Sequence, residues 1–224
     1  NKINVLIIDD HPLITEAYKN ALEVFFDENN NKGFDIETAN NCEKAILKIK
    51  EASSQQKRYD LIFLDIKLPP TKDNKIISGE DIGIEIKTLL PDSKIIISTT
   101  FDDNYRIHSL FKSINPDGFL IKNDITSKEL ISAIKAVLSE GLFYSKTVLK
   151  NLRKEISNDF LLDKIDRKLL FELSQGTKTK NLPNVIPLSI AGIEKRKRHL
   201  KEVFDISVSD DKTLISVARE KGFI

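Results

Sequence analysis

Five short apolar runs, each followed by polar residues and a stretch with helical spacing, constrain the fold of this chain most strongly. The clearest is Leu61–Leu64 within YDLIFLDIKLPP, which is too short for a helix and does not alternate with polar residues. Such a run predicts a strand buried on both faces of a parallel sheet. The others are Ile3–Ile8, Phe34–Ala39, 94–98 and Gly118–Ile121. The alternation predicts a doubly wound, five-stranded parallel α/β sheet with right-handed crossovers.

Helices are expected between and after these runs, over residues 12–26, 43–52, 80–89, 102–114 and 127–140. In the first of them, the apolar spacing places Leu13, Ala17, Ala21 (or Leu22) and Phe25 on the inward face. Thr126 with Glu129 has the spacing of a capping box at the start of the last helix.

Composition bounds the class of protein. The 224 residues are 40% hydrophobic and 31% charged, which suits one or two globular domains with real cores. No apolar run approaches the roughly 18–20 residues that span a bilayer, and the start, NKINVLIIDD, lacks the cleavage pattern of a signal peptide. Cys42 is the only cysteine. It excludes an intramolecular disulfide framework and fits a cytoplasmic protein, with Cys42 in a structural role.

Polar residues follow four of the predicted strands. Asp9 and Asp10 come after the first, Asp65 after the third, Thr99 ends the fourth and Lys122 follows the fifth. The carboxyl ends of parallel strands meet at one edge of the sheet, where ligands bind in such folds. Three carboxylates together need a cation, and hard oxygen ligands suit Mg²⁺. A hydroxyl and an ammonium suit phosphoryl oxygens. The set predicts a Mg²⁺-assisted phosphoryl acceptor with Asp65 as nucleophile.

Each of these residues also has a simpler interpretation when it is considered alone. Asp9 and Asp10 can be a pair favoured by a helix macrodipole, and Asp65 can be a turn residue. Thr99 can be an ordinary strand former, and Lys122 a solvated loop lysine. Their joint occurrence at the expected strand ends favours the functional interpretation.

The segments IIDDHPL, IFLDIKLPP, IIISTTFDD and GFLIK together resemble the receiver domain of two-component response regulators, over about residues 1–142. The resemblance implies a flavodoxin-like fold and phosphorylation of Asp65 from the phosphohistidine of a sensor histidine kinase. It also implies that Mg²⁺ is held by Asp9, Asp10, Asp65 and the backbone carbonyl of Lys67.

The same resemblance implies roles for three further residues. Thr99 contacts the phosphoryl oxygen and moves toward it, Lys122 pairs with the phosphoryl group, and Phe119 occupies the family's switch-aromatic position. His11 follows the acidic pair in many such regulators, and we expect it to have a structural or surface role. A receiver of this type assists only its own phosphotransfer and dephosphorylation, so the chain is not expected to be an enzyme.

The loop PTKDNKIIS, residues 70–78, is about six residues longer than the usual turn of the family. It is either an element that affects kinase choice, a lid that affects phosphoryl lifetime, or a tolerated surface insertion.

Residues 143–161 are expected to form a linker, and residues 162–224 a small all-α domain with helices over 163–174, 189–204 and 211–221. IDRKLLFELSQG and LSIAGIEKRKRHLKEVF resemble the opening and recognition helices of LuxR/NarL-type regulators, which bind DNA through a helix-turn-helix. Pro183 falls inside the helix that should support the recognition helix, and it is expected to shorten or kink that helix.

Positive charge gathers on the expected recognition helix. Residues 176–201 hold seven Lys or Arg and one acid, Glu194, an excess of 7 − 1 = +6 in a chain of net charge +1. Lys195 and Arg198 are predicted to enter the major groove, and Arg196, Lys197 and Lys201 to contact phosphates. The alternative is a solvated basic face. Glu194 stands where the family usually has lysine.

The sequence therefore predicts a response regulator that binds double-stranded DNA as a homodimer after phosphorylation, without a membrane partner. One alternative is a phosphorylation-dependent interaction protein whose divergent effector domain does not bind DNA. The other is a Mg²⁺-dependent phosphohydrolase, but such enzymes usually carry an acid two residues after the nucleophile, where this chain has Lys67.

Overall fold

The computed structural model describes residues 2–29, 33–154, 162–207 and 210–224. The chain divides into two compact units, one from Asn1–Asp102 and Leu110–Arg153 and the other from Asp103–Ser109 and Lys154–Ile224. Each unit has its own hydrophobic core, and each is described by itself below.

The first unit is built on a parallel sheet with the strand order β2-β1-β3-β4-β5-β6. The strands are β1 (Ile3–Ile8), β2 (Phe34–Ala39), β3 (Leu61–Leu64), β4 (Lys94–Thr99), β5 (Gly118–Ile121) and β6 (Phe143–Tyr144). The first five match the predicted strands. The sheet has six strands rather than the predicted five, because β6 pairs with the outer edge of β5. A strand of two residues is too short to show a periodicity in the sequence.

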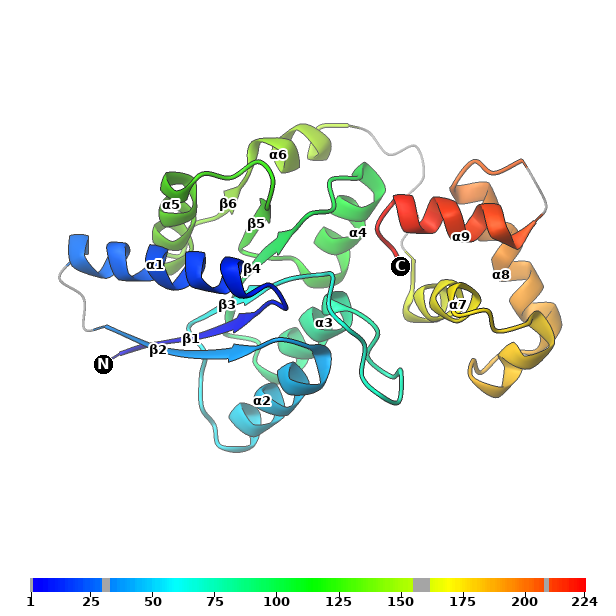
Figure 1. Ribbon diagram of the computed structural model, residues 1–224, viewed down its shortest axis with the longest axis horizontal. Coiled ribbons are helices and arrows are strands. Elements are labelled where there is room, and N and C mark those ends of the chain that lie inside the picture. Colours follow the sequence, from blue (N-terminus) through cyan, green and yellow to red (C-terminus); the bar gives the residue numbers. More distant parts are fainter. Residues whose placement is uncertain (1, 30–32, 155–161, 208–209) are drawn as a thin grey trace. The chain divides into compact units, whose positions relative to one another are not determined.

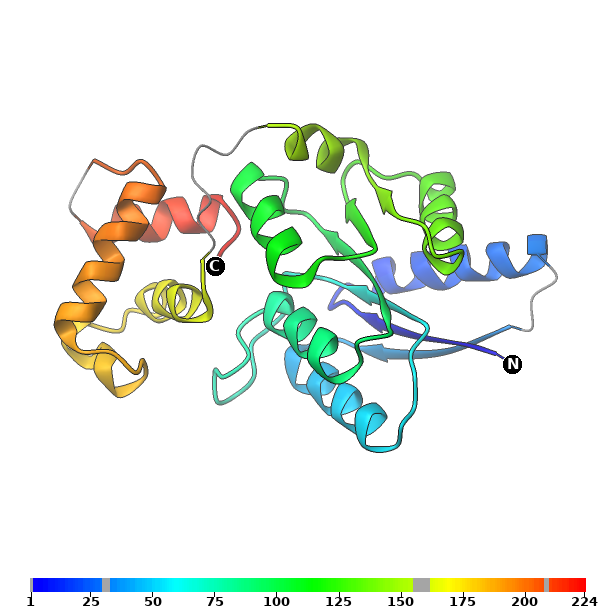
Figure 2. The same ribbon diagram turned by 180° about the vertical axis from the view of Figure 1, so that it is seen from behind.

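Helices cover both faces of this sheet, as Figures 1 and 2 show. One layer contains α1 and α5, which pack on each other, and the opposite layer contains α2 and α3. The helices are α1 (Pro12–Asn29), α2 (Cys42–Ser54), α3 (Gly79–Leu89) and α5 (Ser127–Leu138), together with α4 (Asn104–Ile114), whose residues 104–109 are grouped with the second unit. Thr126 and Glu129 form the predicted capping box of α5. The four residues of β3 are all fully buried between the two layers, as a central parallel strand requires.

The inward face of α1 agrees with the prediction in its second half only. Ala21, Leu22 and Phe25 are buried as predicted, but Leu13 is 85% exposed and Ala17 is also exposed. In the first half of the helix the buried residue is Tyr18, one position later than Ala17. Tyr18 can be buried because its hydroxyl donates a hydrogen bond to Ser98 Oγ at 2.6 Å.

The first part of the expected linker belongs to the sheet domain. After β6, residues Lys146–Leu152 form helix α6, and the first compact unit extends to Arg153. Val148 of α6 is completely buried. The later part of the expected linker, residues 155–161, lies outside the described residues.

The second unit contains α7 (Lys164–Ser174), the 3₁₀ helix η1 (Thr179–Asn184), α8 (Ile190–Val203) and α9 (Asp211–Glu220). Their apolar faces share one core that includes Leu169, Leu182, Leu200 and Leu214. Pro183 lies inside η1. The supporting element is thus a short 3₁₀ helix, in keeping with the expectation that proline shortens it. In the described part of the chain, no helix is both long and apolar enough to span a membrane.

Candidate functional site

The strand register brings the predicted site residues to one edge of the sheet. Ile8 of β1 pairs with Leu64 of β3, and Leu64 pairs with Ile97 of β4. Thr99 pairs with Ile121 at the end of β5. Asp9, Asp65 and Lys122 each follow one of these strand ends directly, so residues 113 positions apart in sequence (122 − 9) share one pocket.

Lys122 joins two of the acids. Its ammonium Nζ lies 2.6 Å from Asp65 Oδ2 and 2.8 Å from Asp9 Oδ2. All three side chains are buried, with exposed fractions of 7%, 2% and 1% for Lys122, Asp65 and Asp9. The other Asp65 oxygen, Oδ1, accepts a hydrogen bond from the main-chain N–H of Lys67 at 3.0 Å. The pocket is therefore a buried, strongly hydrogen-bonded carboxylate site with one cation already in place.

Burial raises the pKa of Asp65 above its usual range, because a buried carboxylate loses its hydration. Lys122 acts in the opposite direction and favours the ionised form, and Asp9 adds a repulsive charge. A desolvated carboxylate is a stronger nucleophile and pairs more strongly with incoming positive charge than one in water does.

Asp10 and His11 complete the cluster. His11 Nδ1 lies 2.8 Å from Asp10 Oδ1 and 3.2 Å from Asp9 Oδ1, and the His11 main-chain N–H also donates to Asp9 Oδ1. Ligand atoms of Asp9, Asp10, His11 and Asp65 all lie within 4.8 Å of one another. The sequence predicted a structural or surface role for His11, and its ring is 57% exposed but contacts the acids of the pocket.

The donor set fits a hard divalent cation. Within the described residues, Asp9 Oδ2 and Asp10 Oδ1 are buried atoms that accept no hydrogen bond, although each faces a basic side chain. Such oxygens are suitable ligands for Mg²⁺, which binds one or two carboxylates and keeps several waters.

Thr99 and Phe119 are both completely buried. Thr99 Oγ1 accepts a hydrogen bond from the Phe101 N–H at 3.3 Å, and the Thr99 carbonyl accepts one from the Lys122 N–H at 2.8 Å. Phe119 of β5 stacks on Phe111 of α4, with ring centroids 5.4 Å apart. The end of β4 at Thr99 is thus bonded directly to Lys122, the residue that follows β5.

Sequence reasoning missed a buried pair on the α1 side of the sheet. Tyr18 stacks on Phe63 of β3 with ring centroids 4.5 Å apart, and its hydroxyl reaches Ser98, the neighbour of Thr99. Burial raises the pKa of Tyr18 well above its ordinary value. The sequence gives only a weak signal for the burial of Tyr18, because a single tyrosine in an amphipathic helix usually lies at the boundary between the buried and exposed faces.

Gly79 brings the long 70–78 loop back against the end of β3. Its N–H donates to the Ile66 carbonyl at 3.0 Å, and a Cβ at this position would lie 1.9 Å from the Asp65 carbonyl oxygen. The loop is ordered by its own hydrogen bonds, including one from the Thr71 N–H to the Ile76 carbonyl at 2.9 Å. Its Lys72 N–H donates to Glu43 of α2. The inserted residues form a compact turn anchored on the domain.

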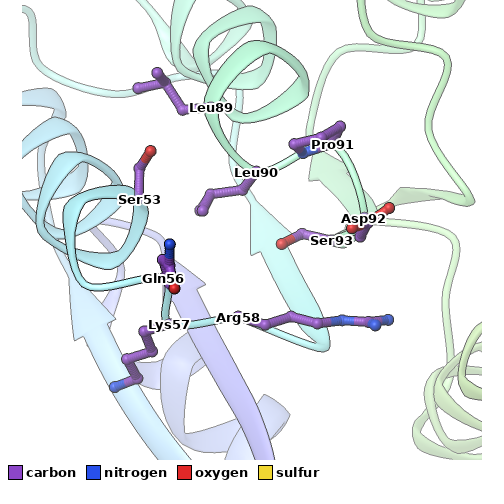
Figure 3. A pocket seen from close by; sticks show the side chains of 9 residues that line it. All are labelled: Ser53, Gln56, Lys57, Arg58, Leu89, Leu90, Pro91, Asp92 and Ser93. Atoms are coloured by element: carbon purple, nitrogen blue, oxygen red, sulfur yellow. The ribbon is translucent and has the colours of Figure 1, made fainter.

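A separate cavity of about 170 Å³ lies at the opposite edge of the sheet, before strands β3 and β4 begin. Figure 3 shows its lining side chains, among them Lys57, Arg58, Leu90 and Ser93. It contains none of the predicted site residues, so the acidic pocket remains the candidate site.

The second unit presents one exposed stripe along α8. The exposed side chains recur at helical spacing and comprise Ile190, Ala191, Glu194, Lys195, Arg198, His199 and Glu202. Lys195 and Arg198, the two residues predicted to read base edges, therefore both point to solvent. The stripe mixes basic and acidic groups rather than carrying one sign of charge.

The other three predicted DNA contacts form ion pairs inside this unit. Arg196 lies 2.8 Å from both Asp163 and Asp166 of the α7 capping box. Lys197 is buried and lies 2.7 Å from Asp211, which also pairs with Lys201 at 3.2 Å. Phosphate contacts by these three residues remain predictions, and in this structure the cations hold α8 against its neighbouring helices.

The fold and pocket define a class: a doubly wound parallel α/β domain with a lysine-bridged acidic pocket at its carboxyl edge, joined to a small helical unit. The family model described as "Response regulator receiver domain" matches residues 5–135, more than half of the 224-residue chain. This chain therefore belongs to the response regulator receiver family.

Curated relatives extend over both units. The transcriptional regulatory protein MctR of Rhizobium johnstonii is 26% identical over 226 residues, which cover 100% of this chain and 96% of that protein. The oxygen regulatory protein NreC of Staphylococcus epidermidis is 23% identical over 211 residues, covering 88% and 89% of the two chains.

Solved structures share the fold over nearly the whole chain. RcsB of Salmonella enterica serovar Typhimurium, bound to promoter rprA in the presence of the phosphomimetic BeF₃⁻, has a TM-score of 0.66 at 19% identity and covers 97% of this chain and 98% of its own. A structure of two RcsB dimers bound to two parallel DNAs has a TM-score of 0.55 at 21% identity, with coverage of 98% and 99%.

Proposed function

We propose that this protein is the response regulator of a two-component phosphorelay. It accepts a phosphoryl group on Asp65 from a sensor histidine kinase in the cytoplasm, dimerises, and regulates transcription by binding double-stranded DNA through its C-terminal unit. The observation that carries the first half is the buried pocket in which Lys122 bridges Asp65 and Asp9. The name of the relative MctR, a transcriptional regulatory protein, supports regulation of transcription, and the solved RcsB dimers bound to DNA support binding as a dimer.

The pocket's own residues suit each part of the transfer. An Asp65 carboxylate oxygen attacks phosphorus, the O–P bond forms as the P–N bond to the donor histidine breaks, and the imidazole leaves with the electron pair of that bond. Lys122, already 2.6 Å from Asp65, supplies positive charge to the phosphoryl oxygens that accumulate negative charge. The buried Thr99 hydroxyl at the neighbouring strand end supplies a hydrogen-bond donor.

Asp9, Asp10 and Asp65, with the Lys67 carbonyl, would hold Mg²⁺ in this site. When bound, the ion neutralises phosphoryl charge and orients the group for transfer.

Phosphorylation is tested with acetyl phosphate and Mg²⁺, and intact-mass spectrometry measures the product. Wild-type protein should gain one phosphoryl group that is lost at alkaline pH, as an acyl phosphate is, and Asp65→Asn should gain none. Asp35→Asn, at an exposed position of β2, is the matched control and should label normally. Equal labelling of wild type and Asp65→Asn would refute the assignment.

DNA binding is tested with two substitutions in α8, by selection from a genomic library followed by titration at several salt concentrations. Arg198→Ala should lose discrimination between sequences by about 1–3 kcal/mol. Lys201→Ala should weaken binding to all sequences alike and lower the salt dependence. Binding that is independent of both substitutions would contradict the assignment of α8 as the recognition helix.

One observation favours a second candidate, a phosphorylation-dependent regulator that binds a protein through its C-terminal unit. Arg196, Lys197 and Lys201 are occupied by carboxylates, and the exposed stripe of α8 includes Glu194 and Glu202. Absence of DNA affinity at low salt, with or without phosphorylation, would decide for this candidate.

We also propose that the chain is not an enzyme with turnover on small molecules. The position two residues after Asp65 is the exposed Lys67, so the pocket lacks the second acid that aspartyl phosphohydrolases usually place there. Sustained hydrolysis of small phosphate esters, abolished by Asp65→Asn, would overturn this proposal.

A further inference from the structure

The segment that follows α5 is bonded into the sheet of the first unit. β6 pairs in parallel with β5, with Phe143 opposite Gly118 and Tyr144 opposite Phe119. Beyond β6, the Ser145 N–H donates to the Phe119 carbonyl at 2.9 Å, and Ser145 Oγ accepts from the Ile121 N–H at 3.3 Å. We call residues Phe143–Leu152, which comprise β6, Ser145 and α6, the strap.

The strap is also bonded to both loops that carry phosphoryl-site residues. Asn151 of α6 is buried, and its Nδ2 donates to the Asp102 carbonyl at 2.9 Å, three residues beyond Thr99. At the other end of α6, the Thr147 N–H donates to Asp124 Oδ2 at 2.9 Å, two residues beyond Lys122. One short helix therefore joins the loop after β4 to the loop after β5.

Aromatic contacts give the strap a third connection. Tyr144 packs edge-on against Phe111, with ring centroids 5.0 Å apart, and Phe111 stacks on the buried Phe119. The Tyr144 hydroxyl reaches the Pro116 carbonyl at 3.4 Å. A change in the position of the Phe119 ring must therefore be accommodated by Phe111 and Tyr144.

We infer that the strap is the element through which the acidic pocket controls the rest of the chain, an inference that rests on the proposed phosphorylation of Asp65. A phosphoryl group adds negative charge and three acceptor oxygens where Lys122 now bridges Asp9 and Asp65. Lys122 and the Thr99 hydroxyl must regroup around it. The loops that follow Thr99 and Lys122 carry the Asp102 carbonyl and the Asp124 carboxylate, which accept hydrogen bonds from α6. Movement of these loops therefore weakens the attachment of the strap.

The size of the attachment suits such a switch. The strap is held by a two-residue strand, by three buried side chains (Ser145, Val148 and Asn151) and by a few hydrogen bonds, so it lies at the low-stability end of the domain. A single charge event can shift an equilibrium of this size. The strap precedes the C-terminal unit in sequence, so release of the strap lengthens the segment that joins the two units.

The experiment is amide hydrogen exchange of the full-length chain, measured by mass spectrometry with and without Mg²⁺ and beryllofluoride. Exchange in the strap should accelerate by about tenfold, the change expected when one or two hydrogen bonds are lost, while amides next to the acidic pocket become protected. Asp65→Asn should show neither effect.

A second experiment tests the same coupling in the opposite direction, from the strap to the loop after β4, and needs no phosphoryl mimic. Asn151→Ala should accelerate exchange in residues 100–103, because the Asp102 carbonyl loses its donor. Asn20→Ala, an exposed position of α1, is the matched control and should leave that loop unchanged.

The outcomes separate this inference from the proposed function. Protection of the pocket by beryllofluoride with no change in the strap would overturn the inference and leave the proposed function standing. No response of either region to beryllofluoride would overturn both. If Asn151→Ala leaves hydrogen exchange in residues 100–103 unchanged, the inference is wrong whatever the response to beryllofluoride.

Discussion

Lys122 is the residue on which the charge balance of the pocket depends in the absence of a metal ion. Its ammonium lies within 2.8 Å of carboxylates from two different strand ends, and all three groups are buried. Removing one partner of a buried ion pair leaves an uncompensated charge, which is strongly destabilising. A divalent cation in the same pocket would compensate the same carboxylates.

Lys122→Met should therefore lower the free energy of unfolding by about 3–5 kcal/mol without Mg²⁺, and added Mg²⁺ should restore more stability than it adds to wild type. Urea unfolding followed by tyrosine fluorescence, in EDTA and in Mg²⁺, measures both quantities. Lys50→Met, at an exposed position of α2, controls for the loss of a lysine. A variant as stable as wild type in EDTA would contradict the role given to Lys122.

Glu37 shows how a charge pair affects stability far from the pocket. Its carboxylate accepts from Lys48 at 2.5 Å and also pairs with Lys57. Partial burial acts to raise the pKa of Glu37, but the two lysines outweigh it and lower the pKa to about 2. Because the folded-state pKa is depressed, the stabilisation is present above the ordinary pKa of about 4.5 and is lost as pH falls toward 2.

Glu37→Gln should cost about 1 kcal/mol at pH 7, a value reduced for solvent screening of this partly exposed pair. The difference from wild type should shrink between pH 4.5 and about 2. Urea unfolding at a series of pH values measures it, with Glu23→Gln on the exposed face of α1 as control. A difference that grows as the solution becomes more acidic would refute the assignment.

At the level of secondary structure elements, α8 is attached to its neighbours by charge as well as by apolar packing. Asp211, the first residue of α9, lies within 3.2 Å of both Lys197 and Lys201 of α8. Arg196 is bound in the same way by the start of α7. These carboxylates offset the basic charge that the sequence places on this helix.

Asp211→Asn should release positive charge toward the phosphates of DNA. We expect tighter, less sequence-dependent DNA binding and a salt dependence steeper by about one phosphate contact. Asp205→Asn removes one charge from an exposed position of the same unit and controls for net charge. Fluorescence anisotropy at several salt concentrations measures DNA binding by both variants. An unchanged salt dependence in Asp211→Asn would show that Asp211 does not compete with DNA phosphates for the lysines of α8.

Elements with a strong local pattern were predictable, and those determined by distant contacts were not. The strands before Asp65 and Lys122 are continuous apolar runs, so their ends, and with them the pocket, follow from the sequence. β6 has two residues and depends on the open edge of β5, which no local pattern shows. The inward face of the first half of α1 was misplaced because Tyr18 is satisfied by Ser98, 80 residues away.

The pairing of the basic residues of α8 was equally hidden. The five basic residues of the run EKRKRHLK look equivalent in the sequence. Only the packing of α7 and α9 shows that Arg196, Lys197 and Lys201 face carboxylates. Lys195 and Arg198 face solvent.

On the scale of the whole molecule, the two separate cores imply that a ligand can stabilise one unit without stabilising the other. One core lies between the sheet and its helices, and the other is shared by α7, η1, α8 and α9. A ligand that binds only the folded form of one unit stabilises that unit by mass action.

Mg²⁺ with beryllofluoride should therefore raise the stability of the sheet unit, by about 2.7 kcal/mol at a hundredfold excess over the dissociation constant, and leave that of the helical unit unchanged. Hydrogen exchange in low concentrations of urea can follow peptides from β3 and from α8 in one sample. An equal gain in both peptides would show that the chain unfolds as a single cooperative body.

The two residues of β6 have a practical consequence for dissecting this protein. A fragment ended at residue 142, the boundary that the sequence indicates, would leave the N–H and C=O groups of β5 open along one side. Unsatisfied edges of this kind recruit other chains. Such a fragment should self-associate and precipitate, whereas one ended after Arg153 would keep this side of β5 paired with β6.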